Sequence, residues 1–419
     1  MDDDAAKVES LGSGRVPFYE PGLQELVDEG RAAGRLTFTG DLRAALDGTE
    51  IAFVCVGTPG LADGAPNLAY VERVGRDAAV FATNDLVLVE KSTVPANTGV
   101  RLSQIIQREQ ARTGSPEGAD KDRVRIEVAS NPEFLREGSA VSDTLHPDRI
   151  VIGSATPDAG ETVRRVYEPM LADHDCPVVM TDLPTAELIK HASNAFLATR
   201  ISFINAVAQI CEQVGADVTT VAQGMGYDKR IGPHFLNAGL GYGGSCFPKD
   251  VAAFHHLSES VGYEFRLLDA VRQINGDMRR LVMDKLRSEV WHLQDKTVTL
   301  LGAAFKPGTD DLREAPALYL LEQLLDEGAT VRVYDPVATG QVKERYPQVE
   351  VFEDPIEALT DAHAAIVCTE WDQVRALTPA QMVAALGYPI VIDGRNVFDP
   401  QAMEAAGVAY HGIGRGSPQ

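Results

Sequence analysis

The chain has 419 residues, of which 44% are hydrophobic and 24% are charged, and its formal net charge is −23. This length is enough for two or three domains with sizeable cores, and the acidic balance argues against nucleic-acid binding, because neutralising phosphates requires a basic surface. Such acidity is typical either of an ordinary acidic enzyme or of a protein adapted to high salt, where screening relieves the self-repulsion.

The first part of the chain alternates between strand and helix patterns. Short β-branched apolar runs that end in turn residues predict buried parallel strands at residues 51–57, 86–92 and 124–130. Helical patterns lie between them at residues 68–82 and 97–109. Residues 112–121 combine Gly, Ser, Pro and charges, which predicts an exposed loop.

The middle of the chain is helical and a second alternating block follows it. A long helix is predicted at residues 184–214, with Pro184 in its first turn, and helical signal returns at residues 266–291. The second block predicts a helix at 315–328 and strands at 296–305, 329–336, 364–370 and 388–396. We therefore expect an α/β fold, with two Rossmann-like parallel-sheet domains joined by a central helical region.

Polar motifs follow the predicted strands. They are VGTPG, EKSTVP, SNPEFLREG, GAAFKPGTDD and DGRNVF. Ligands of open α/β sheets bind outside the carboxyl ends of the strands. The sequence therefore predicts that these loops line a ligand site.

The run GLGYGGSCFPKDV at residues 239–251 places Cys246 after a glycine-rich turn, with Lys249 and Asp250 close behind. Glycines let a ligand approach the backbone, and a neighbouring cation stabilises a thiolate. Both features indicate a nucleophile. By itself, a lone cysteine of this kind is more often a packing residue.

Lys190 and Asn194 are four residues apart in the long helix, and therefore lie on one face of it. A lysine on a helix usually faces solvent. The small and apolar residues around this pair favour packing against a site instead.

The sequence also indicates the cellular compartment in which the protein works. We find neither a stretch long enough to span a bilayer nor a signal-peptide pattern, so we expect a soluble, cytoplasmic protein. The five cysteines are scattered, odd in number and without metal-ligand spacing. We therefore expect reduced thiols and no metal site.

Long motifs along nearly the whole chain resemble those of the UDP-glucose/GDP-mannose dehydrogenase family. The matching runs are residues 16–27, 56–59, 90–95, 131–140, 186–218, 230–251, 305–318 and 393–399. The resemblance implies a truncated NAD-binding domain at 1–183, a central helical domain with the catalytic helix and cysteine loop at 184–291, and a UDP-sugar-binding domain at 292–419. It also implies a homodimer or a higher homo-oligomer, with Arg230 supplied to the neighbouring subunit's site.

By the same resemblance, the reaction is a four-electron oxidation of a nucleotide sugar by two NAD⁺, through a thiohemiacetal and a thioester on Cys246. The run CFPKD, with Phe247, is similar to the UDP-glucose branch and implies that UDP-glucose becomes UDP-glucuronate. The other catalytic residues implied are Lys190, Asn194, Asp250, Glu133 and Thr93. Asp250 also has a simpler interpretation as a helix N-cap after Pro248, and Thr93 as part of an ordinary turn.

The resemblance further implies two sets of binding residues. The NAD contacts are Asp2, Lys7, Val56, Gly57, Thr58, Pro59, Thr93, Glu137 and Arg313. The sugar-nucleotide contacts are Glu133, Phe134, Leu135, Arg136, Lys190, Asn194, Arg230, Phe235, Leu236, Asn237, Gly239, Tyr242, Gly243, Lys306 and Arg395. Lys306 and Arg395 supply cations that suit a diphosphate.

The beginning of the chain departs from the family pattern. Residues 1–8 resemble the end of the family's second strand, and Gly12-Ser13-Gly14 does not replace the GxGxxG turn that seats a pyrophosphate. The preferred explanation is a start codon placed downstream of the true one; a real truncation and a degenerate paralogue are the alternatives. Without the first strand, its neighbours would be unpaired and their apolar faces open to water.

Three alternative functions stay open. One is a related dehydrogenase for GDP-mannose or a UDP-N-acetylhexosamine. Another is a non-catalytic UDP-sugar-binding homologue, although retention of all six catalytic residues speaks against it. A simple β-hydroxyacid dehydrogenase would share the Lys190 and Asn194 pair, but it would need neither a thiol nor a second α/β domain.

Overall fold

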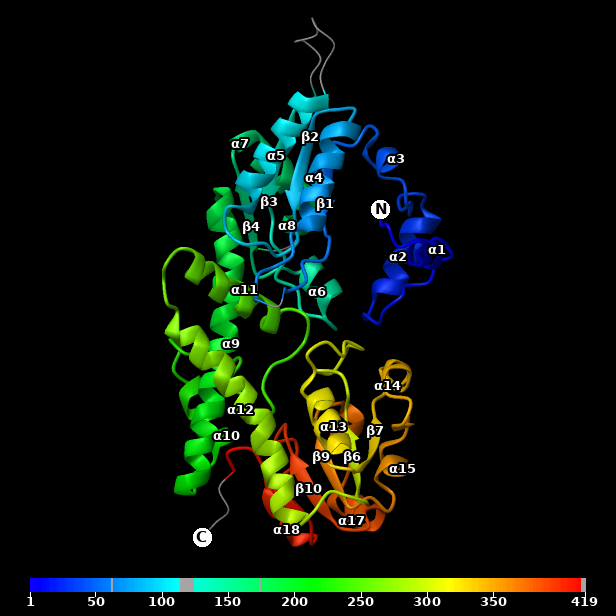
Figure 1. The fold of residues 1–419 in the computed structure, drawn as a ribbon, viewed down its shortest axis with the longest axis vertical. Coiled ribbons are helices and arrows are strands. Elements are labelled where there is room, and N and C mark those ends of the chain that lie inside the picture. The colour runs from blue at the N-terminus through cyan, green and yellow to red at the C-terminus, as the bar shows by residue number, and fades with distance from the viewer. Residues whose placement is uncertain (62, 114–123, 173–174, 416–419) are drawn as a thin grey trace, which may run out of the picture. The chain divides into compact units, whose positions relative to one another are not determined.

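The computed structural model describes residues 1–61, 63–113, 124–172 and 175–415. The chain forms two compact units (Figure 1): unit 1 comprises Met1–Ser193 and Ala252–Glu264, and unit 2 comprises Asn194–Val251 and Phe265–Gln419. Helices α9 (Leu183–Val214) and α11 (Phe247–Ser260) each contribute residues to both units.

Unit 1 contains a five-stranded sheet in the order β1-β2-β3-β4-β5. The strands are β1 (Ile51–Val54), β2 (Leu86–Glu90), β3 (Ile126–Ser130), β4 (Ile150–Ser154) and β5 (Val178–Thr181). The first three are parallel and confirm the strands predicted there, whereas β4 runs antiparallel to β3 and parallel to β5. The sequence interpretation missed β4 and β5, so it did not foresee this reversal.

Helices cover both faces of this sheet, with α4 (Ala69–Phe81) and α5 (Thr98–Thr113) on one face and α7 (Pro157–Val166) on the other. The other helices of this part of the chain are α1 (Ala5–Gly12), α2 (Leu23–Ala32), α3 (Leu42–Leu46), α6 (Ala140–Leu145) and α8 (Glu168–Leu171). Along β2, Leu86 and Leu88 pack in the cluster with α4 and α5, while Val87 and Val89 pack in the cluster with α7. Burial on both faces explains why β2 reads as a continuous apolar run.

Strand β1 has a single partner among the described residues, which is β2. Phe53, in this strand, is 38% exposed. Residues 1–4 contain no strand, and the Asp4 carboxylate caps α1 by accepting hydrogen bonds from the N–H groups of Ala6 and Lys7. Of the loop predicted at residues 112–121, Arg112 and Thr113 end α5 and the rest lies outside the described residues.

Unit 2 contains a six-stranded sheet in the order β11-β10-β9-β6-β7-β8, and all of its neighbouring strands are parallel. The strands are β6 (Thr297–Leu301), β7 (Thr330–Tyr334), β8 (Glu350–Phe352), β9 (Ala364–Val367), β10 (Ile390–Asp393) and β11 (Ala409–Gly412). Four of them confirm the prediction. The strands that the sequence analysis missed, β8 and β11, are both short edge strands.

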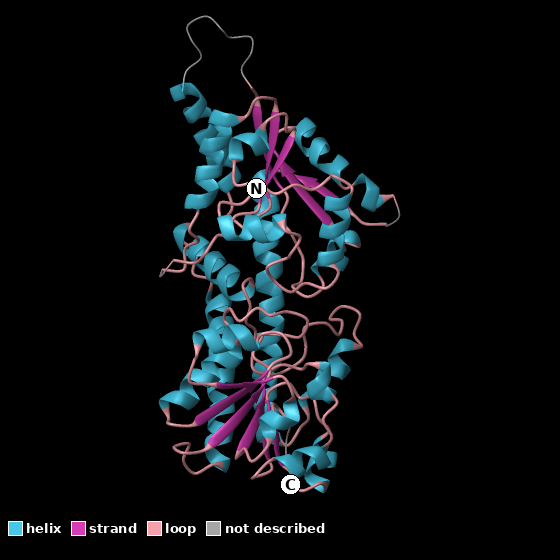
Figure 2. Ribbon diagram, turned by 90° about the vertical axis from the view of Figure 1, so that its right-hand side faces the viewer, coloured by secondary structure: helices cyan, strands magenta, loops and turns pink. Residues whose placement is uncertain are grey.

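The helices of unit 2 include two that the sequence predicts directly, α12 (Arg266–Glu289) and α13 (Pro316–Asp326). The others are α10 (Val218–Gly226), α14 (Thr339–Arg345), α15 (Pro355–Leu359), α16 (Asp372–Arg375), α17 (Pro379–Ala385) and α18 (Pro400–Ala405). Figure 2 shows that helices flank the sheet of each unit.

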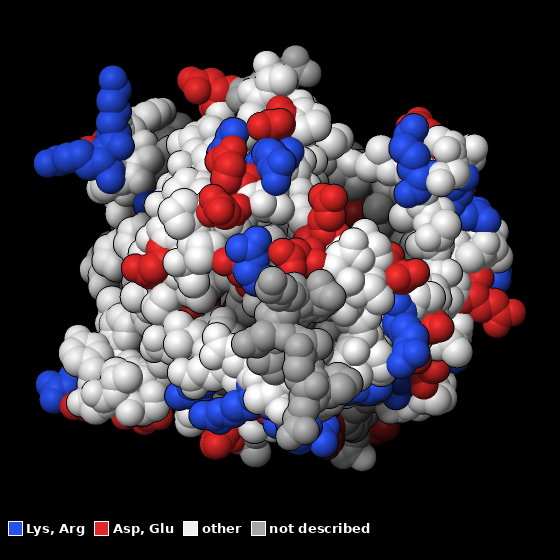
Figure 3. All heavy atoms as spheres, turned by 90° about the horizontal axis from the view of Figure 1, so that it is seen from above, with Lys and Arg blue, Asp and Glu red and all other residues white. Residues whose placement is uncertain are grey.

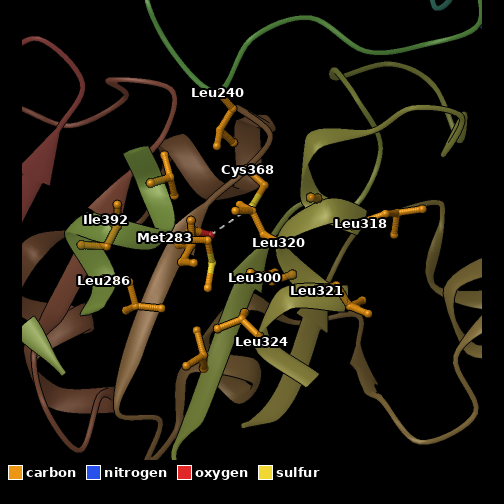
Figure 4. Packing of buried hydrophobic residues seen from close by; sticks show 14 of the residues in the cluster. Leu240, Met283, Leu286, Leu300, Leu318, Leu320, Leu321, Leu324, Cys368 and Ile392 are labelled. Atoms are coloured by element: carbon orange, nitrogen blue, oxygen red, sulfur yellow. Dashed lines mark hydrogen bonds between the residues drawn. The ribbon is translucent and has the colours of Figure 1, made fainter. Parts of the chain in front are cut away.

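The core of unit 2 forms where α12 and α13 meet the sheet (Figure 4). Leu286 of α12, Leu320 of α13 and Leu300 of β6 belong to one buried cluster, which also includes Cys368. The Cys368 thiol donates to the carbonyl of Ile366, and burial raises the pKa of this thiol to about 12. Cys368 is therefore a packing residue rather than a nucleophile.

Acidic and basic side chains are interspersed on the face shown in Figure 3. Within the described part of the chain, no helix combines the length and the apolar character that crossing a bilayer requires.

Candidate functional site

The loops that follow β1 and β2 are fastened to each other. The Ser92 hydroxyl donates to the carbonyl of Val56 (2.6 Å), and the Thr58 hydroxyl donates to the carbonyl of Thr93 (3.0 Å). These bonds bring the VGTP and EKSTVP motifs together at the carboxyl ends of parallel strands, where α/β sheets bind ligands.

This strand-end loop has room for a ligand against its backbone. A Cβ atom added to Gly57 or to Gly60 would meet no heavy atom within 4 Å. Thr58 is buried and its hydroxyl is already used, so it shapes the loop, whereas Gly57 and Pro59 are exposed. An open glycine backbone at the end of a parallel strand suits a dinucleotide.

Lys190 and Glu133 form a partly buried ion pair in unit 1. The Lys190 ammonium lies 3.0 Å from a Glu133 carboxylate oxygen, and only 4% of the lysine side chain is exposed. The same ammonium lies 5.3 Å from the centroid of the Phe134 ring, over which the Arg149 guanidinium also stacks at 3.7 Å. The structure therefore brings together three of the predicted site residues and adds Arg149, which the sequence analysis did not single out.

The loop that carries Glu133 is held by a carboxylate from the N-terminal segment. Glu20 accepts hydrogen bonds from the N–H groups of Gly138 (2.7 Å) and Ala140 (2.8 Å), at the start of α6. An acidic group at a helix N-terminus is stabilising. The sequence analysis included Glu20 only within the matching run of residues 16–27 and gave it no role, because a link across this distance in sequence is invisible locally.

Several predicted binding residues are paired with near neighbours in sequence. Asp2 binds Lys7 at 2.6 Å, which lowers the pKa of the Asp2 carboxyl. Arg136 binds Asp143 (2.6 Å) and Arg313 binds Asp311 (2.7 Å), and both arginine side chains are about two-thirds exposed, at 67% and 68%. Leu135 is exposed and Glu137 is half-buried.

Cys246 occupies the position that caps helix α11. Its carbonyl accepts the N–H of Asp250 (2.8 Å), and its sulfur lies 3.4 Å from the Ser245 hydroxyl oxygen. The N-terminus of a helix carries partial positive charge, which stabilises a thiolate. This environment distinguishes Cys246 from the packing residue Cys368.

Asp250 is buried inside the first turns of α11 and receives two strong hydrogen bonds. Its carboxylate accepts from the Asn194 amide (2.6 Å) and from the Lys249 ammonium (2.6 Å). Because α11 begins at Phe247, the alternative that Asp250 is the N-cap is wrong: Asp250 lies within the helix. Its side chain is instead fixed by the helix α9 that carries Asn194.

The glycine loop before Cys246 passes very close to other backbone segments of unit 2. A Cβ atom at Gly239 would lie 2.6 Å from the Gly394 carbonyl oxygen, and one at Gly243 would lie 2.3 Å from the Glu314 carbonyl oxygen. Gly244 has a φ of +80° and faces the Phe305 ring, 2.8 Å from its would-be Cβ. Only glycine allows these approaches.

Two buried asparagines hold this loop, and the sequence analysis missed both. Asn205 of α9 accepts the N–H of Gly239 (2.8 Å), and Asn275 of α12 binds both the N–H (2.8 Å) and the carbonyl (3.1 Å) of Tyr242. In the sequence, each of them is a single asparagine among the apolar residues of a helix. The same pattern occurs at many surface positions, so it does not identify a buried asparagine. The Tyr242 ring is buried against Phe247, and burial raises its pKa to about 12.

Arg395 joins three strand-end segments. Its guanidinium donates to the carbonyls of Cys368 (2.7 Å), Phe305 (3.1 Å) and Gly241 (3.5 Å). The predicted phosphate ligand is thus also a brace for the glycine loop. Lys306, half-buried beside the Phe305 ring, follows β6 in the same unit.

The remaining candidate residues for sugar-nucleotide binding precede the glycine loop in the sequence. Phe235 has a φ of +61°, and its ring centroid lies 6.2 Å from that of Phe247. Leu236 is buried, whereas Asn237 is exposed. Arg230 is 89% exposed and pairs with Asp228 (2.6 Å).

Comparison with known proteins decides the family. Sequence models of the UDP-glucose/GDP-mannose dehydrogenase family match the chain in three segments: the NAD binding domain at residues 1–171, the central domain at 184–277 and the UDP binding domain at 299–400. The chain belongs to the UDP-glucose/GDP-mannose dehydrogenase family. NAD is accordingly its cofactor, and the exposed Gly57 loop lies in the segment that matches the NAD binding domain.

Relatives in this family are similar over almost the whole chain. UDP-glucose 6-dehydrogenase TuaD of Bacillus subtilis (strain 168) is 43% identical over 99% of this chain and 87% of its own length. The UDP-glucose 6-dehydrogenase of Pseudomonas aeruginosa is 44% identical over 99% of this chain and 91% of its own. Among solved structures, a UDP-glucose dehydrogenase from Pyrobaculum islandicum has a TM-score of 0.88 and 37% identity, covering 98% of this chain and 90% of that one.

The close approach of Gly244 to Phe305 gives a testable prediction. We expect Gly244→Ala to cost about 1–2 kcal/mol for its left-handed backbone and about 1–3 kcal/mol more for the collision. We also expect it to lower kcat, because Cys246 lies two residues away. Urea unfolding and steady-state kinetics measure the two effects.

The matched control is Gly215→Ala. Gly215 has a φ of +73°, but a Cβ there meets no heavy atom within 4 Å. Gly215→Ala should therefore lower the free energy of unfolding only by the cost of the left-handed backbone and should leave kcat unchanged. Equal effects of the two substitutions would contradict the packing argument.

Proposed function

We propose that this protein oxidises UDP-glucose to UDP-glucuronate with NAD⁺, as a UDP-glucose 6-dehydrogenase. The observation that carries the proposal is the position of Cys246 at the N-terminus of α11, in the segment where Asp250 binds Asn194. Relatives with the name UDP-glucose 6-dehydrogenase, similar over 99% of the chain, support the choice of sugar. We also propose domain boundaries at residues 1–183, 184–291 and 292–419.

The covalent step follows from the chemistry of a thiol. The Cys246 thiolate adds to the carbonyl carbon of the C6 aldehyde, forming a C–S bond and a thiohemiacetal. Loss of hydride from that carbon leaves a thioester, and attack by water breaks the C–S bond, releasing the carboxylate and restoring the thiol. NAD⁺ supplies the hydride acceptor for both oxidations, so one UDP-glucose gives two NADH.

The other residues have roles that suit their surroundings. Lys190, largely buried, and Asn194, four residues further along α9, stabilise the oxyanion that develops on the sugar oxygen. Asp250 orients the Asn194 amide and accepts the first proton through water. Glu133, with Thr93 positioning water, acts as the base in thioester hydrolysis.

Binding of the two ligands uses the strand-end loops. Val56, Gly57, Thr58, Pro59 and Thr93 would hold NAD⁺, and Asp2, Lys7, Glu137 and Arg313 would add further contacts. The sugar nucleotide would contact Phe134, Leu135, Arg136, Phe235, Leu236, Asn237, Gly239, Tyr242, Gly243, Lys306 and Arg395.

Substitution of the nucleophile tests this scheme. We expect Cys246→Ala to lower NADH production by on the order of a thousandfold or more, because no covalent intermediate can form. Binding of UDP-glucose, measured by calorimetry, should change little. Cys176→Ala is the control and should keep the wild-type ratio of two NADH per UDP-glucose. Normal turnover of Cys246→Ala would refute the thioester scheme; wild type that binds UDP-glucose without making NADH would instead indicate a non-catalytic homologue.

We further propose that the protein is a homodimer joined through α9. Phe196, Phe203 and Ile210 recur every seven residues on this helix and are 61%, 52% and 62% exposed. Exposed apolar side chains aligned on one helix face indicate a surface that another helix covers. A second copy of the chain would present the same stripe, which makes a two-fold interface self-complementary.

Arg230 lies beside this stripe. Arg200, between Phe196 and Phe203 on α9, donates to the carbonyls of Ile231 (2.7 Å) and Gly232 (2.8 Å). The Arg230 guanidinium is exposed there. This placement supports the proposal that Arg230 reaches the sugar nucleotide of the neighbouring subunit.

Charge on the stripe should separate the subunits. We expect the double variant Phe203→Glu/Ile210→Glu to sediment with the mass of one chain. The free-energy cost of burying two unpaired carboxylates in the interface exceeds the stabilisation that the apolar contact provides. Trp291→Glu is the control: Trp291 is 97% exposed and lies outside α9. A monomeric wild type, or a double variant that stays dimeric, would contradict the proposed interface.

Mixed dimers test the role of Arg230. Arg230→Ala and Cys246→Ala should each be nearly inactive alone. When the two variants are co-expressed, a heterodimer contains one site with both Cys246 and a partner's Arg230, so we expect activity to return. The absence of rescue in purified heterodimers would show that Arg230 does not act across the interface.

A further inference from the structure

Two glutamates are buried together beneath the predicted site of unit 1. Glu90, the last residue of β2, is 1% exposed, and Glu187 of α9 is 2% exposed. Neither has a catalytic or binding role in the scheme above. Buried carboxylates are rare unless they are paired, so this pair requires an explanation.

The hydrogen bonds of the two carboxyls are unequal. Glu187 accepts the N–H of Asn97 (2.6 Å) and the N–H of Gly99 (2.7 Å), at the start of α5. Among the described residues, neither oxygen of Glu90 receives a hydrogen bond. A buried acceptor without a donor is costly, which means that Glu90 as a carboxylate would be strongly disfavoured.

Gly99 lies against both carboxyls and so places them near each other. A Cβ atom built on Gly99 would lie 2.8 Å from a Glu90 carboxyl oxygen and 3.2 Å from a Glu187 carboxyl oxygen. Burial, and then the charge of Glu187 and a hydrogen bond to it, raise the pKa of the Glu90 carboxyl. A proton on Glu90 would let this carboxyl donate such a bond. That proton would supply the partner that the Glu90 oxygens otherwise lack.

The cations nearby are engaged elsewhere. Lys91, next to Glu90, donates to the Asn131 amide oxygen and to the Tyr167 hydroxyl, both at 3.0 Å. Lys190, one turn beyond Glu187, binds Glu133. No ion pair to Glu90 or Glu187 occurs within the described chain.

The strands on either side of β2 place uncharged residues opposite Glu90. The strands beside β2 place Val54 and Ser130 opposite Glu90, and Cys55 follows Val54. His191 on α9 makes its Nε2 contact with the carbonyl of Val94 (2.9 Å). Two ionised carboxyls at this point would therefore repel each other.

The surroundings of the two carboxyls indicate that Glu90, rather than Glu187, carries the proton. Burial and the neighbouring Glu187 raise the pKa of Glu90 well above its ordinary value, and burial raises the pKa of Glu187 to about 7. The two N–H donors favour the charged form of Glu187, whereas Glu90 has none. A carboxylate next to a protonated carboxyl satisfies both groups.

We propose that Glu90 and Glu187 share one proton at neutral pH, with Glu90 donating its O–H to Glu187, and that the pair positions Thr93 and Lys190. Thr93 lies three residues after Glu90, and Lys190 lies three residues after Glu187. The positioning role rests on the proposed function; the shared proton does not. Loss of this proton would leave two adjacent negative charges and push the end of β2 away from α9.

The pair has a defined effect on stability. Because folding raises the pKa of both carboxyls above 4.5, the folded state binds more protons than the unfolded chain. The stabilisation is therefore present at low pH and is lost as pH rises from about 4.5 through the folded pKa values. A salt-bridged carboxylate shows the opposite trend.

Glu90→Gln tests the shared proton, because glutamine keeps a donor but cannot ionise. Infrared spectra of the wild type at neutral pH should contain a carboxylic-acid C=O band that is absent from Glu90→Gln. The control is Glu109→Gln: Glu109 is also buried, but it pairs with Arg76 and Arg112, which lower its pKa, so this variant should keep the band. Identical spectra of the wild type and Glu90→Gln would overturn the proposal.

Unfolding across pH gives a second readout without substrate. The free energy of unfolding of the wild type, minus that of Glu90→Gln, should fall as pH rises above about 4.5. The free energy of unfolding of the wild type, minus that of Glu109→Gln, should instead rise as pH increases through the ordinary range of a glutamate. The same sign for both variants would contradict a shared proton.

Kinetics tests the positioning role. We expect kcat of the wild type to fall at alkaline pH, where the shared proton is lost. Glu90→Gln should retain kcat within about threefold near neutral pH and should not show this fall. Glu90→Ala should lower kcat at every pH. Equal alkaline declines in wild type and Glu90→Gln would remove the positioning role. Absence of turnover in the wild type, with the infrared band present, would refute the proposed function and leave the shared proton standing.

Discussion

The close approach between the glycine loop and the strand-end loops of unit 2 is the constraint on which the placement of Cys246 depends. Gly239 and Gly243 lie against the carbonyls of Gly394 and Glu314, at distances where no side chain fits. Arg395 fills the remaining space with bonds to three carbonyls. The loop is therefore fixed from several sides before it enters α11, and the thiol has a defined position.

Buried polar side chains do most of this fixing. Asn205 and Asn275 hold the glycine loop, and Asp250 is held by Asn194. At the end of β7, Asp335 accepts the N–H groups of Ala303 and Ala304, which orients the loop after β6 that leads to Lys306. Each bond satisfies a buried donor or acceptor, so its loss would cost more than the contact alone suggests. In this protein the scaffold and the site therefore share the same hydrogen bonds.

The sequence predicted most of the architecture for identifiable reasons. Strands such as β2 and β6, buried on both faces, leave long apolar runs, and helices α9 and α12 leave a clear helical pattern. The edge strands β5, β8 and β11 were missed because strands of three or four residues that are only partly buried carry little pattern of their own. Strand β4 is a buried apolar run like those predicted, and the sequence analysis overlooked it. The antiparallel direction of β4 depends on its pairing with β3, which no local signal records.

The sequence by itself determined the family and the cofactor and indicated the candidate reactive groups, because a thiol, a lysine or a glycine turn is chemically recognisable wherever it lies. Only the tertiary structure decided which groups support them. Glu20 clamps the Glu133 loop, Glu187 binds the start of α5, and Asp250 is not a helix cap. Hydrogen bonds and burial join residues far apart in the chain, so their energies depend on neighbours that sequence spacing does not reveal.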